Sequence, residues 1–335
     1  MEPSQLIRIT NADSSQVGHA RRRAISLATS IGFGEVRLGQ LSIIVTEAAR
    51  NIATHANEGQ LIVSPWVVGN RAGIDVFAID KAKGIQDIDR ACEDGFSTAG
   101  TPGQGLGAIS RLAGKFQIYS VPNAGTILFA RVFRETSEQE STVDDFAFGA
   151  VSVPVSGETA CGDAWGARYE AGRSIYIMAD GLGHGPFAAE ASQEAIRVFH
   201  EIPNRAPEII LKEIHLALAK TRGAAISIAE ILHEPGILNY AGAGNISTVA
   251  YCSGKTKSLV SMNGTVGHAV ARFQQFTYPW ESNSTLIMHS DGLTTRWNMD
   301  TYSGLASRHP ALIAALFFRD FTRGRDDATI LVTRK

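Results

Sequence analysis

The sequence predicts two consecutive domains of the α+β class. The chain has 335 residues, which is long for a single hydrophobic core. Segments of helical periodicity and segments of strand character occur in both halves. Between them, residues 134–145 are polar and acidic and have no apolar period. We therefore expect one domain at residues 1–133, a linker at 134–146 and a second domain at 147–335.

The composition excludes several classes of protein. The 44% hydrophobic and 19% charged residues indicate a globular chain, and a net charge of −2 offers no basic excess for binding nucleic acid. The three cysteines form no CxxC pair, so we predict neither a disulfide framework nor a zinc site. The N-terminus lacks the apolar core of a signal peptide, and the apolar run 311–318 is too short to span a bilayer. We expect a cytoplasmic protein that does not bind membranes.

The first half alternates helices with hairpins. Helical spacing of apolar residues and β-rich apolar runs predict, in order, a helix ending near Ile31, a helix at 36–55, a hairpin at 60–79, a helix at 108–113 and a hairpin at 115–133. The glycine-rich loop GQGLG at 103–107 leads into the third helix. Such a loop presents free backbone N–H groups that can bind phosphate.

Glu47 and Asn51 are the first candidate site residues. They are four positions apart on the second predicted helix and therefore share one face. A carboxylate beside an amide can orient a hydroxyl and hold a magnesium ion. The alternative is an ordinary solvated helix face. Asp80, which ends the strand after this helix, is the next candidate.

The order of these parts resembles the ATP-binding domain shared by histidine kinases, gyrase and the small bacterial anti-sigma serine kinases. The resemblance covers residues 5–133. It is carried particularly by TEAARNI at 46–52 and DGFSTAGTPGQGLGAISRL at 94–112, which are similar to the serine kinases of the stress-response switch. The resemblance implies an α/β sandwich of the histidine-kinase-like ATPase type that binds ATP with Mg²⁺.

The same resemblance assigns roles to individual residues. It implies that Glu47 is the base for an acceptor serine, that Asn51 helps to bind Mg²⁺ and that Asp80 hydrogen-bonds the adenine amino group. The nucleotide-binding residues that it implies are Asn51, Asp80, Gly84, Gly103, Gly105, Leu106 and Gly107. Where the family has DxGxG, this chain has Ala82 in place of the first glycine. Alanine is tolerated there if the backbone is not left-handed, and it narrows the adenine pocket otherwise.

The second half mixes short strands with a helical pair, which predicts a layered α+β domain. The predicted strands and helices are, in order, a strand at 146–155, a strand at 173–179, helices at 186–201 and 206–220, strands at 224–232, 237–243, 246–252, 257–260 and 284–289, a helix at 309–321 and a final strand after Asp327. The strand that precedes the ADGLGHG turn at 179–185 is the most apolar of these, and it delivers an aspartate to that turn.

Aspartates at strand edges, each beside small residues, recur along the second half. They are Asp163 in CGDAW, Asp180 in ADGLGHG, Asp291 in SDGL, and Asp326 with Asp327 in RDDAT. Each alone could be a solvated turn residue, but four such places favour one common cluster. Converging carboxylates repel one another, and a pair of divalent cations is the usual resolution. Two such ions can ionise a water and polarise a phosphoryl oxygen, so we predict phosphate monoester hydrolysis.

These motifs, with YAGAGN at 240–245 and NGTVG at 263–267, resemble the metal-dependent type 2C protein serine/threonine phosphatases of the bacterial sporulation and stress-response branch. The likeness covers 147–335 and implies an α-β-β-α layered fold holding two Mn²⁺ or Mg²⁺ ions. It implies that Asp180 bridges both metals, that Gly181 contributes its carbonyl, and that Asp291 and Asp326 hold one metal. Asp163 is placed at the site directly or through a water. Asp327 ranks below Asp326.

Four nearby residues complete the candidates. Cys161 replaces the first glycine of the family's usual GGD, which is a mild change. Arg168 and Arg173 are candidates for a phosphate clamp. His184 is interpreted as a residue that shapes the GHG turn rather than as an acid.

The predicted function is a switch regulator that dephosphorylates a partner protein. The resemblance implies a phosphoserine or phosphothreonine on a small anti-sigma-factor antagonist of the STAS type, attacked directly by water without a phosphoenzyme. Two roles stay open for the first half: a kinase that acts on the same class of partner, or a nucleotide-sensing module that controls the phosphatase. A pure binding regulator is disfavoured because the metal carboxylates are all present. Contacts with other switch proteins and a homodimer also stay open.

Overall fold

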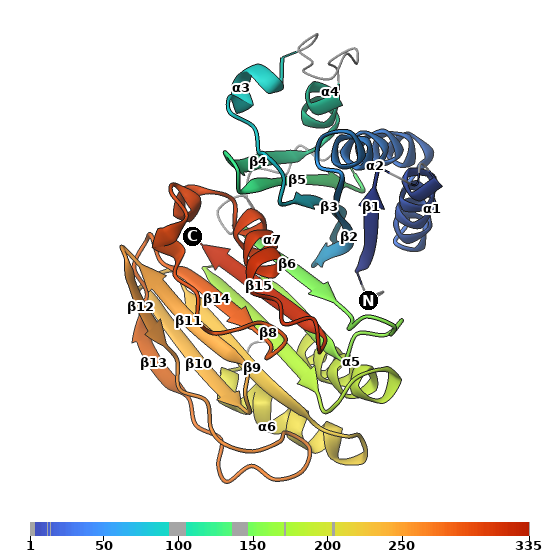
Figure 1. The fold of residues 1–335 in the computed structure, drawn as a ribbon. Coiled ribbons are helices and arrows are strands. Elements are labelled where there is room, and N and C mark those ends of the chain that lie inside the picture. The colour runs from blue at the N-terminus through green and yellow to red at the C-terminus, as the bar shows by residue number, and fades with distance from the viewer. Residues whose placement is uncertain are drawn as a thin grey trace. The chain divides into compact units, whose positions relative to one another are not determined.

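The computed structural model describes residues 4–11, 13, 15–93, 105–135, 147–170, 172–202 and 205–334. The contacts between residues divide the chain into two compact units, Glu2–Gln139 and Glu140–Lys335 together with Met1. Both are of mixed α and β structure, so the predicted fold class is confirmed (Figure 1). In the described part of the chain, no helix is both long enough and apolar enough to cross a membrane.

The first unit is a five-stranded antiparallel sheet with helices against one face (Figure 1). The strand order is β1-β2-β3-β5-β4. The helices and strands are β1 Gln5–Thr10, α1 Ser15–Ser30, α2 Glu35–His55, β2 Glu58–Val68, β3 Arg71–Asp80, α3 Ile88–Ala91, α4 Gly105–Leu112, β4 Lys115–Val121 and β5 Gly125–Phe133. Leu27 of α1 and Leu41 and Ile44 of α2 pack on Val63 and Val76 of the sheet, and all five side chains are buried. This core fixes α2 across the sheet beside the end of β3.

The second unit packs two five-stranded antiparallel sheets face to face. Their strand orders are β13-β10-β9-β8-β7 and β12-β11-β14-β15-β6. The strands are β6 Ala147–Val153, β7 Asp163–Glu170, β8 Arg173–Gly181, β9 Ala224–Leu232, β10 Ile237–Ala243, β11 Ser247–Cys252, β12 Lys255–Ser258, β13 Phe276–Pro279, β14 Thr285–His289 and β15 Ala328–Arg334. The hydroxyls of Tyr176 in β8 and Thr333 in β15 are 2.7 Å apart and join the two sheets inside the core.

Helices cover both outer faces of this sandwich. They are α5 Pro186–Glu201, α6 Pro207–Ala217 and α7 Pro310–Phe321. The first two pack on the sheet that contains β8, where Phe199 and Ile214 join Ile177 and Ile228 in one buried cluster. The third packs on β6 and β15 of the other sheet. The resulting order of layers is α-β-β-α, as the sequence predicts (Figure 1).

The predicted segments differ from the structure in a few places. The helix predicted at 108–113 begins at Gly105, so the second half of the glycine-rich loop forms the first turn of α4. The helix predicted at 206–220 ends as α6 at Ala217 and continues as a short 3-10 helix, Leu218–Lys220. Three strands, β1, β7 and β13, were not predicted. The most important is β7, an edge strand whose alternation is interrupted by Gly166.

Gly149 of β6 provides a test of the packing of α7. A β-carbon built on Gly149 would lie 2.2 Å from the Cα of Ala311, because α7 crosses the strand at this glycine. Backbone cannot yield as a flexible side chain can, so we expect Gly149→Ala to lower the free energy of unfolding by about 1–3 kcal/mol. Urea unfolding measures this. Gly39→Ala in α2 is the control, because nothing lies within 4 Å of the added methyl group. Equal stability of the two variants would contradict the packing.

Candidate functional site

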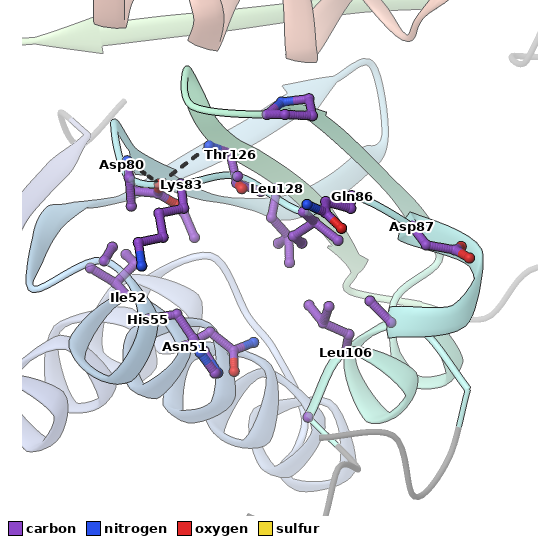
Figure 2. A pocket seen from close by; sticks show the side chains of 18 of the residues that line it. Asn51, Ile52, His55, Asp80, Lys83, Gln86, Asp87, Leu106, Thr126 and Leu128 are labelled. Carbon is purple, nitrogen blue, oxygen red and sulfur yellow. Dashed lines mark hydrogen bonds between the residues drawn. The ribbon is translucent and has the colours of Figure 1, made fainter. Parts of the chain in front are cut away.

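A cavity of about 550 Å³ opens in the first unit between α2, the end of β3 and the start of α4. Figure 2 shows Asn51 of α2 and Leu106 of α4 across this pocket from Asp80, Lys83 and Thr126. Its walls combine aliphatic side chains with a few polar groups, which is the usual character of a small-molecule site.

Asn51 and Gly105 line this pocket, and Glu47, which is not among the lining residues, lies beside Gly105. A β-carbon on Gly105 would lie 3.1 Å from Glu47 Oε2 and 3.4 Å from Asn51 Oδ1. Glu47 also pairs with Arg50, at 3.1 Å. The Asn51 Nδ2 atom is buried and has no hydrogen-bond partner among the described residues. A buried amide without a partner is costly, and a bound polar ligand would supply the missing acceptor.

Asp80 is held at the edge of the pocket by two backbone groups. Its Oδ1 accepts hydrogen bonds from the N–H of Ala82 at 2.8 Å and of Thr126 at 3.3 Å. Ala82 is not among the described residues with a left-handed backbone, so the condition under which alanine is tolerated there is met. Gly84 has φ +70, and a β-carbon there would lie 2.4 Å from the Val121 carbonyl oxygen. Glycine is therefore required at position 84 but not at position 82.

The structure brings most of the predicted nucleotide residues to this pocket. Asn51, Asp80, Gly84, Gly105 and Leu106 line it, whereas Gly107 is buried within α4 and does not. Gly103 lies outside the described residues.

The basic residues of the pocket were missed by the sequence analysis. His55 and Lys83 both line it (Figure 2). His55 stands four residues after Asn51, so the helical spacing that linked Glu47 to Asn51 extends to it. Arg90 lines the pocket as well, and the carboxylates of Asp80 and Asp87 accompany these basic groups. Basic side chains in a pocket suit a phosphate-bearing ligand.

The candidate metal site lies in the second unit, where strand ends from both sheets approach. Asp163 at the start of β7 is the register partner of Asp180 at the end of β8. Asp291 follows β14, and Asp326 and Asp327 precede β15. The hydroxyl of Ser290 donates to Asp163 Oδ2 at 2.6 Å and so connects the two sheets at the site.

The carboxylates of this site lie within electrostatic reach of one another. The pKa of Asp180 is raised to about 9, mainly by burial and then by the negative charges of Asp163, Asp291, Asp326 and Asp327. The pKa of Asp163 is raised to about 7, again mainly by burial, while the hydrogen bond from Ser290 acts in the opposite direction. Burial and the Asp326 charge also raise the pKa of Asp291. Clustered carboxylates of this kind create a site with a strong need for cations.

Asp327 differs from the other aspartates because backbone groups already engage it. Its Oδ1 accepts from the Val155 N–H and its Oδ2 from the Gly162 N–H, both at 2.7 Å. Asp327 is 3% exposed. It therefore ties the segment between β6 and β7 to the start of β15 and positions Asp163. Asp326 beside it is exposed.

The donor set fits hard divalent cations. Asp180, Asp291 and Asp326 offer carboxylate oxygens, and the amide of Asn245 donates to Asp291 Oδ2 at 2.8 Å. A β-carbon on Gly181 would lie 2.1 Å from the Ala188 carbonyl oxygen, so this close backbone requires glycine. Among the described residues, no three His, Cys, Asp or Glu side chains form a set that could hold a metal ion alone. A bound ion would thus take further oxygens from the backbone and from water.

The two arginines considered for a phosphate clamp are used elsewhere. Arg173 pairs with Glu230 at 2.6 Å. Arg168 donates to the Ile202 carbonyl at 2.6 Å and lies over the Phe199 ring. Arg173 therefore joins neighbouring strands of its sheet and Arg168 joins its strand to α5, so both guanidiniums are engaged in structural contacts away from the aspartates.

Cys161 and His184 flank the metal site. The Cys161 thiol is buried, 3.6 Å from the Ser152 hydroxyl, and burial raises its pKa far above the usual range. It is therefore an inert packing group in place of glycine. His184 lies 2.9 Å from Glu158 and is exposed, in the turn before α5.

Together these sites define a histidine-kinase-like ATPase domain followed by a phosphatase domain of the type 2C fold. The model for the histidine kinase-like ATPase domain matches residues 10–132, and the model for stage II sporulation protein E (SpoIIE) matches residues 170–335. The chain belongs to the family that joins an RsbT-type ATPase domain to a SpoIIE-type phosphatase domain.

Two curated relatives from Bacillus subtilis (strain 168) correspond to the two halves. The serine/threonine-protein kinase RsbT is 36% identical over 107 residues, which cover 32% of this chain and 80% of RsbT. The phosphoserine phosphatase RsbX is 28% identical over 138 residues, which cover 41% of this chain and 69% of RsbX.

Two solved structures share the fold. One is a structure reported as "The bacterial stressosome: a modular system that has been adapted to control secondary messenger signaling". Its TM-score is 0.54 and its sequence identity 24%, and the match covers 56% of this chain and 99% of the other chain. RsbX in complex with magnesium has a TM-score of 0.50 and 22% identity, covering 65% of this chain and 98% of its own.

Proposed function

We propose that the second unit is a metal-dependent phosphatase that hydrolyses phosphoserine or phosphothreonine on a small STAS-type anti-sigma-factor antagonist. The observation that carries this proposal is that four aspartates, Asp163, Asp291, Asp326 and Asp327, lie within electrostatic reach of Asp180 at the strand ends of two sheets. The similarity to RsbX, a phosphoserine phosphatase, supports the substrate class, and the similarity to RsbT supports a partner of the switch type.

The aspartates would hold two Mn²⁺ or Mg²⁺ ions, which when bound supply an activated water and positive charge for the phosphoryl oxygens. Asp180, Asp291 and Asp326 are the proposed ligands, with the Gly181 carbonyl. Ser290 orients Asp163 through its hydroxyl, and its hydrogen bond favours the ionised carboxylate. Gly181 lets the backbone of the turn pack directly on α5. These supports keep the carboxylates in place before any ion binds.

Metal dependence tests this function on the full chain. With Mn²⁺ present, the protein should release inorganic phosphate from a phosphoserine STAS-domain protein, measured with a dye for free phosphate. EDTA should abolish the release, and added Mn²⁺ should restore it, because the proposed ligands are all oxygens with no reactive group of their own. Release that is unaffected by EDTA would refute the metal mechanism.

We propose in addition that the first unit binds ATP and phosphorylates the same class of partner. The approach of Glu47 and Asn51 to Gly105, together with the buried unpartnered amide of Asn51, supports this role. Asn51 would bind Mg²⁺ and the phosphates, and Asp80, oriented by two backbone N–H groups, would receive the adenine amino group. Glu47 would accept the proton from the hydroxyl of the acceptor serine. The serine oxygen would bond to the γ-phosphorus of ATP while the bond to ADP breaks and ADP leaves. The alternative is a nucleotide-sensing module that only regulates the phosphatase.

A further inference from the structure

A fixed turn that carries Arg222 lies beside the Asp180 loop. Leu182 donates its backbone N–H to the Gly223 carbonyl at 3.0 Å. Within the turn, the Gly223 N–H donates to the Thr221 hydroxyl at 3.0 Å, and that hydroxyl donates to the Leu218 carbonyl at 2.9 Å. These hydrogen bonds hold the backbone around Arg222 against the loop that leaves β8. The position of this arginine is therefore set by the same segment that positions Asp180.

The guanidinium of Arg222 lies at the rim of that loop. Its Nη1 is 3.2 Å from the position that a β-carbon on Gly183 would take, and its Cζ is 5.0 Å from the centre of the Phe187 ring. Arg222 is exposed, and it forms no ion pair with any carboxylate of the described residues. Stacking on an aromatic ring orients a guanidinium while leaving its N–H groups for a ligand. The result is an oriented cation beside the loop that follows Asp180.

Two exposed apolar side chains and a groove lie near Arg222. Leu182 and Phe187, on either side of the turn, are 50% and 62% exposed although both are large and apolar. An open groove of about 680 Å³ runs from here along α5. Its lining is mixed: small and apolar residues at Ala160, Pro186, Ala189 and Ala217, and polar or charged residues at Glu190, Gln193, Glu194, Arg197 and Thr221. Exposed apolar groups beside a groove are typical of a surface that binds another protein.

We propose that Arg222, Leu182 and Phe187 form the edge that recognises the phosphorylated segment of the protein substrate. Arg222 donates hydrogen bonds to oxygens of the phosphoryl group, and Leu182 and Phe187 with the adjoining groove bind the residues that flank the phosphoserine. The occupant is the partner protein because the edge adjoins the loop that follows Asp180 of the proposed metal site, and because an oriented guanidinium complements a phosphate. This inference rests on the proposed phosphatase function.

Two substrates separate the parts of the proposal. The first is p-nitrophenyl phosphate, which has a phosphoryl group but no polypeptide, and the second is a phosphoserine STAS-domain protein. Arg222→Ala should raise KM for both substrates roughly tenfold or more, since hydrogen bonds to charged groups are of that strength, with little change in kcat. Arg222→Lys should recover only part of the loss, because lysine keeps the charge but not the planar fork. Arg308→Ala, at another exposed arginine of this unit, is the control and should match wild type.

A separate variant tests the apolar part of the proposed edge. Leu182→Ala should raise KM for the phosphoprotein and leave p-nitrophenyl phosphate hydrolysis unchanged, because the Phe187 ring that orients Arg222 is still present. Wild-type KM values for Arg222→Ala on both substrates would refute the phosphate contact. If Leu182→Ala alters only the sedimentation of the chain and leaves phosphoprotein KM unchanged, the edge serves self-association and the proposal is overturned. If the wild-type chain hydrolyses neither substrate with Mn²⁺, the phosphatase function itself fails, which is a different outcome.

Discussion

Asp180→Asn should reduce phosphate release from a phosphoserine protein by at least about a hundredfold, because loss of even a supporting residue of a metal site often costs ten- to a hundredfold. Asp180 lies opposite Asp163 and is influenced by four other carboxylates. Asparagine has nearly the same shape but lacks the negative charge that the proposed carboxylate ligand would supply to the ions. The loss should therefore be in metal binding and turnover, with the fold retained.

A thermal-unfolding experiment separates these effects. Mn²⁺ should raise the unfolding temperature of the wild-type chain, since a ligand that binds only the native state stabilises it. Asp180→Asn without metal should be at least as stable as wild type, because one of several repelling carboxylates is gone, but Mn²⁺ should no longer stabilise it. Asp300→Asn is the matched control, since its amide oxygen can still accept the hydrogen bond from Tyr251. Wild-type activity in Asp180→Asn would refute its role as a ligand.

Sequence periodicity predicted the elements whose apolar faces are buried. The helices α2 and α5 and the strands β9 and β10 follow the predicted residues closely because each buries a regular apolar pattern. The edge strand β7 was missed because its outer edge is unpaired, its side chains are partly exposed and Gly166 interrupts its alternation. That strand carries Asp163, so its absence from the prediction hid the pairing of Asp163 with Asp180.

The residues of the candidate site could be proposed from the sequence, but the contacts that support them could not. Motif order pointed to Asp163, Asp180, Asp291 and Asp326, and the family resemblance ranked Asp327 below Asp326 without giving a structural reason. Only the structure reveals that backbone N–H groups occupy both oxygens of Asp327. Ser290 and Arg222 were likewise invisible, because their roles depend on contacts with residues distant in the sequence.

In the proposed nucleotide site, one residue, Ala82, could not be judged from the sequence. The departure at Ala82 could not be evaluated from sequence, because its cost depends on the backbone angle at that residue. The structure places the left-handed backbone at Gly84 rather than at Ala82, and it places the Ala82 N–H on Asp80. Alanine at position 82 therefore does not argue against nucleotide binding. ATP binding and phosphate transfer need separate tests, because a pocket can bind ATP without transferring the γ-phosphate to a protein.

Glu47→Gln should slow phosphate transfer from ATP to a STAS-domain protein by about a hundred- to ten-thousandfold, the usual contribution of a general base. ATP affinity, measured by calorimetry, should change little, because glutamine preserves the size of the side chain near Gly105. Asn51→Ala should weaken ATP binding as well, since it removes the amide that the pocket leaves unpartnered. The transfer assay uses radiolabelled ATP in an Asp180→Asn background, so that the proposed phosphatase cannot remove the label.

Glu35→Gln is the matched control for the kinase experiment, because Glu35 is an exposed glutamate in the first turn of the same helix. It should transfer label at the rate of the Asp180→Asn parent. Transfer at that parent rate by Glu47→Gln would exclude a catalytic base at this position. If the parent binds ATP but labels no STAS-domain protein, the first unit is a nucleotide-sensing module. The pocket would then bind ATP to control the phosphatase, and the expected readout would be a change in phosphate release by the wild-type chain on addition of a non-hydrolysable ATP analogue.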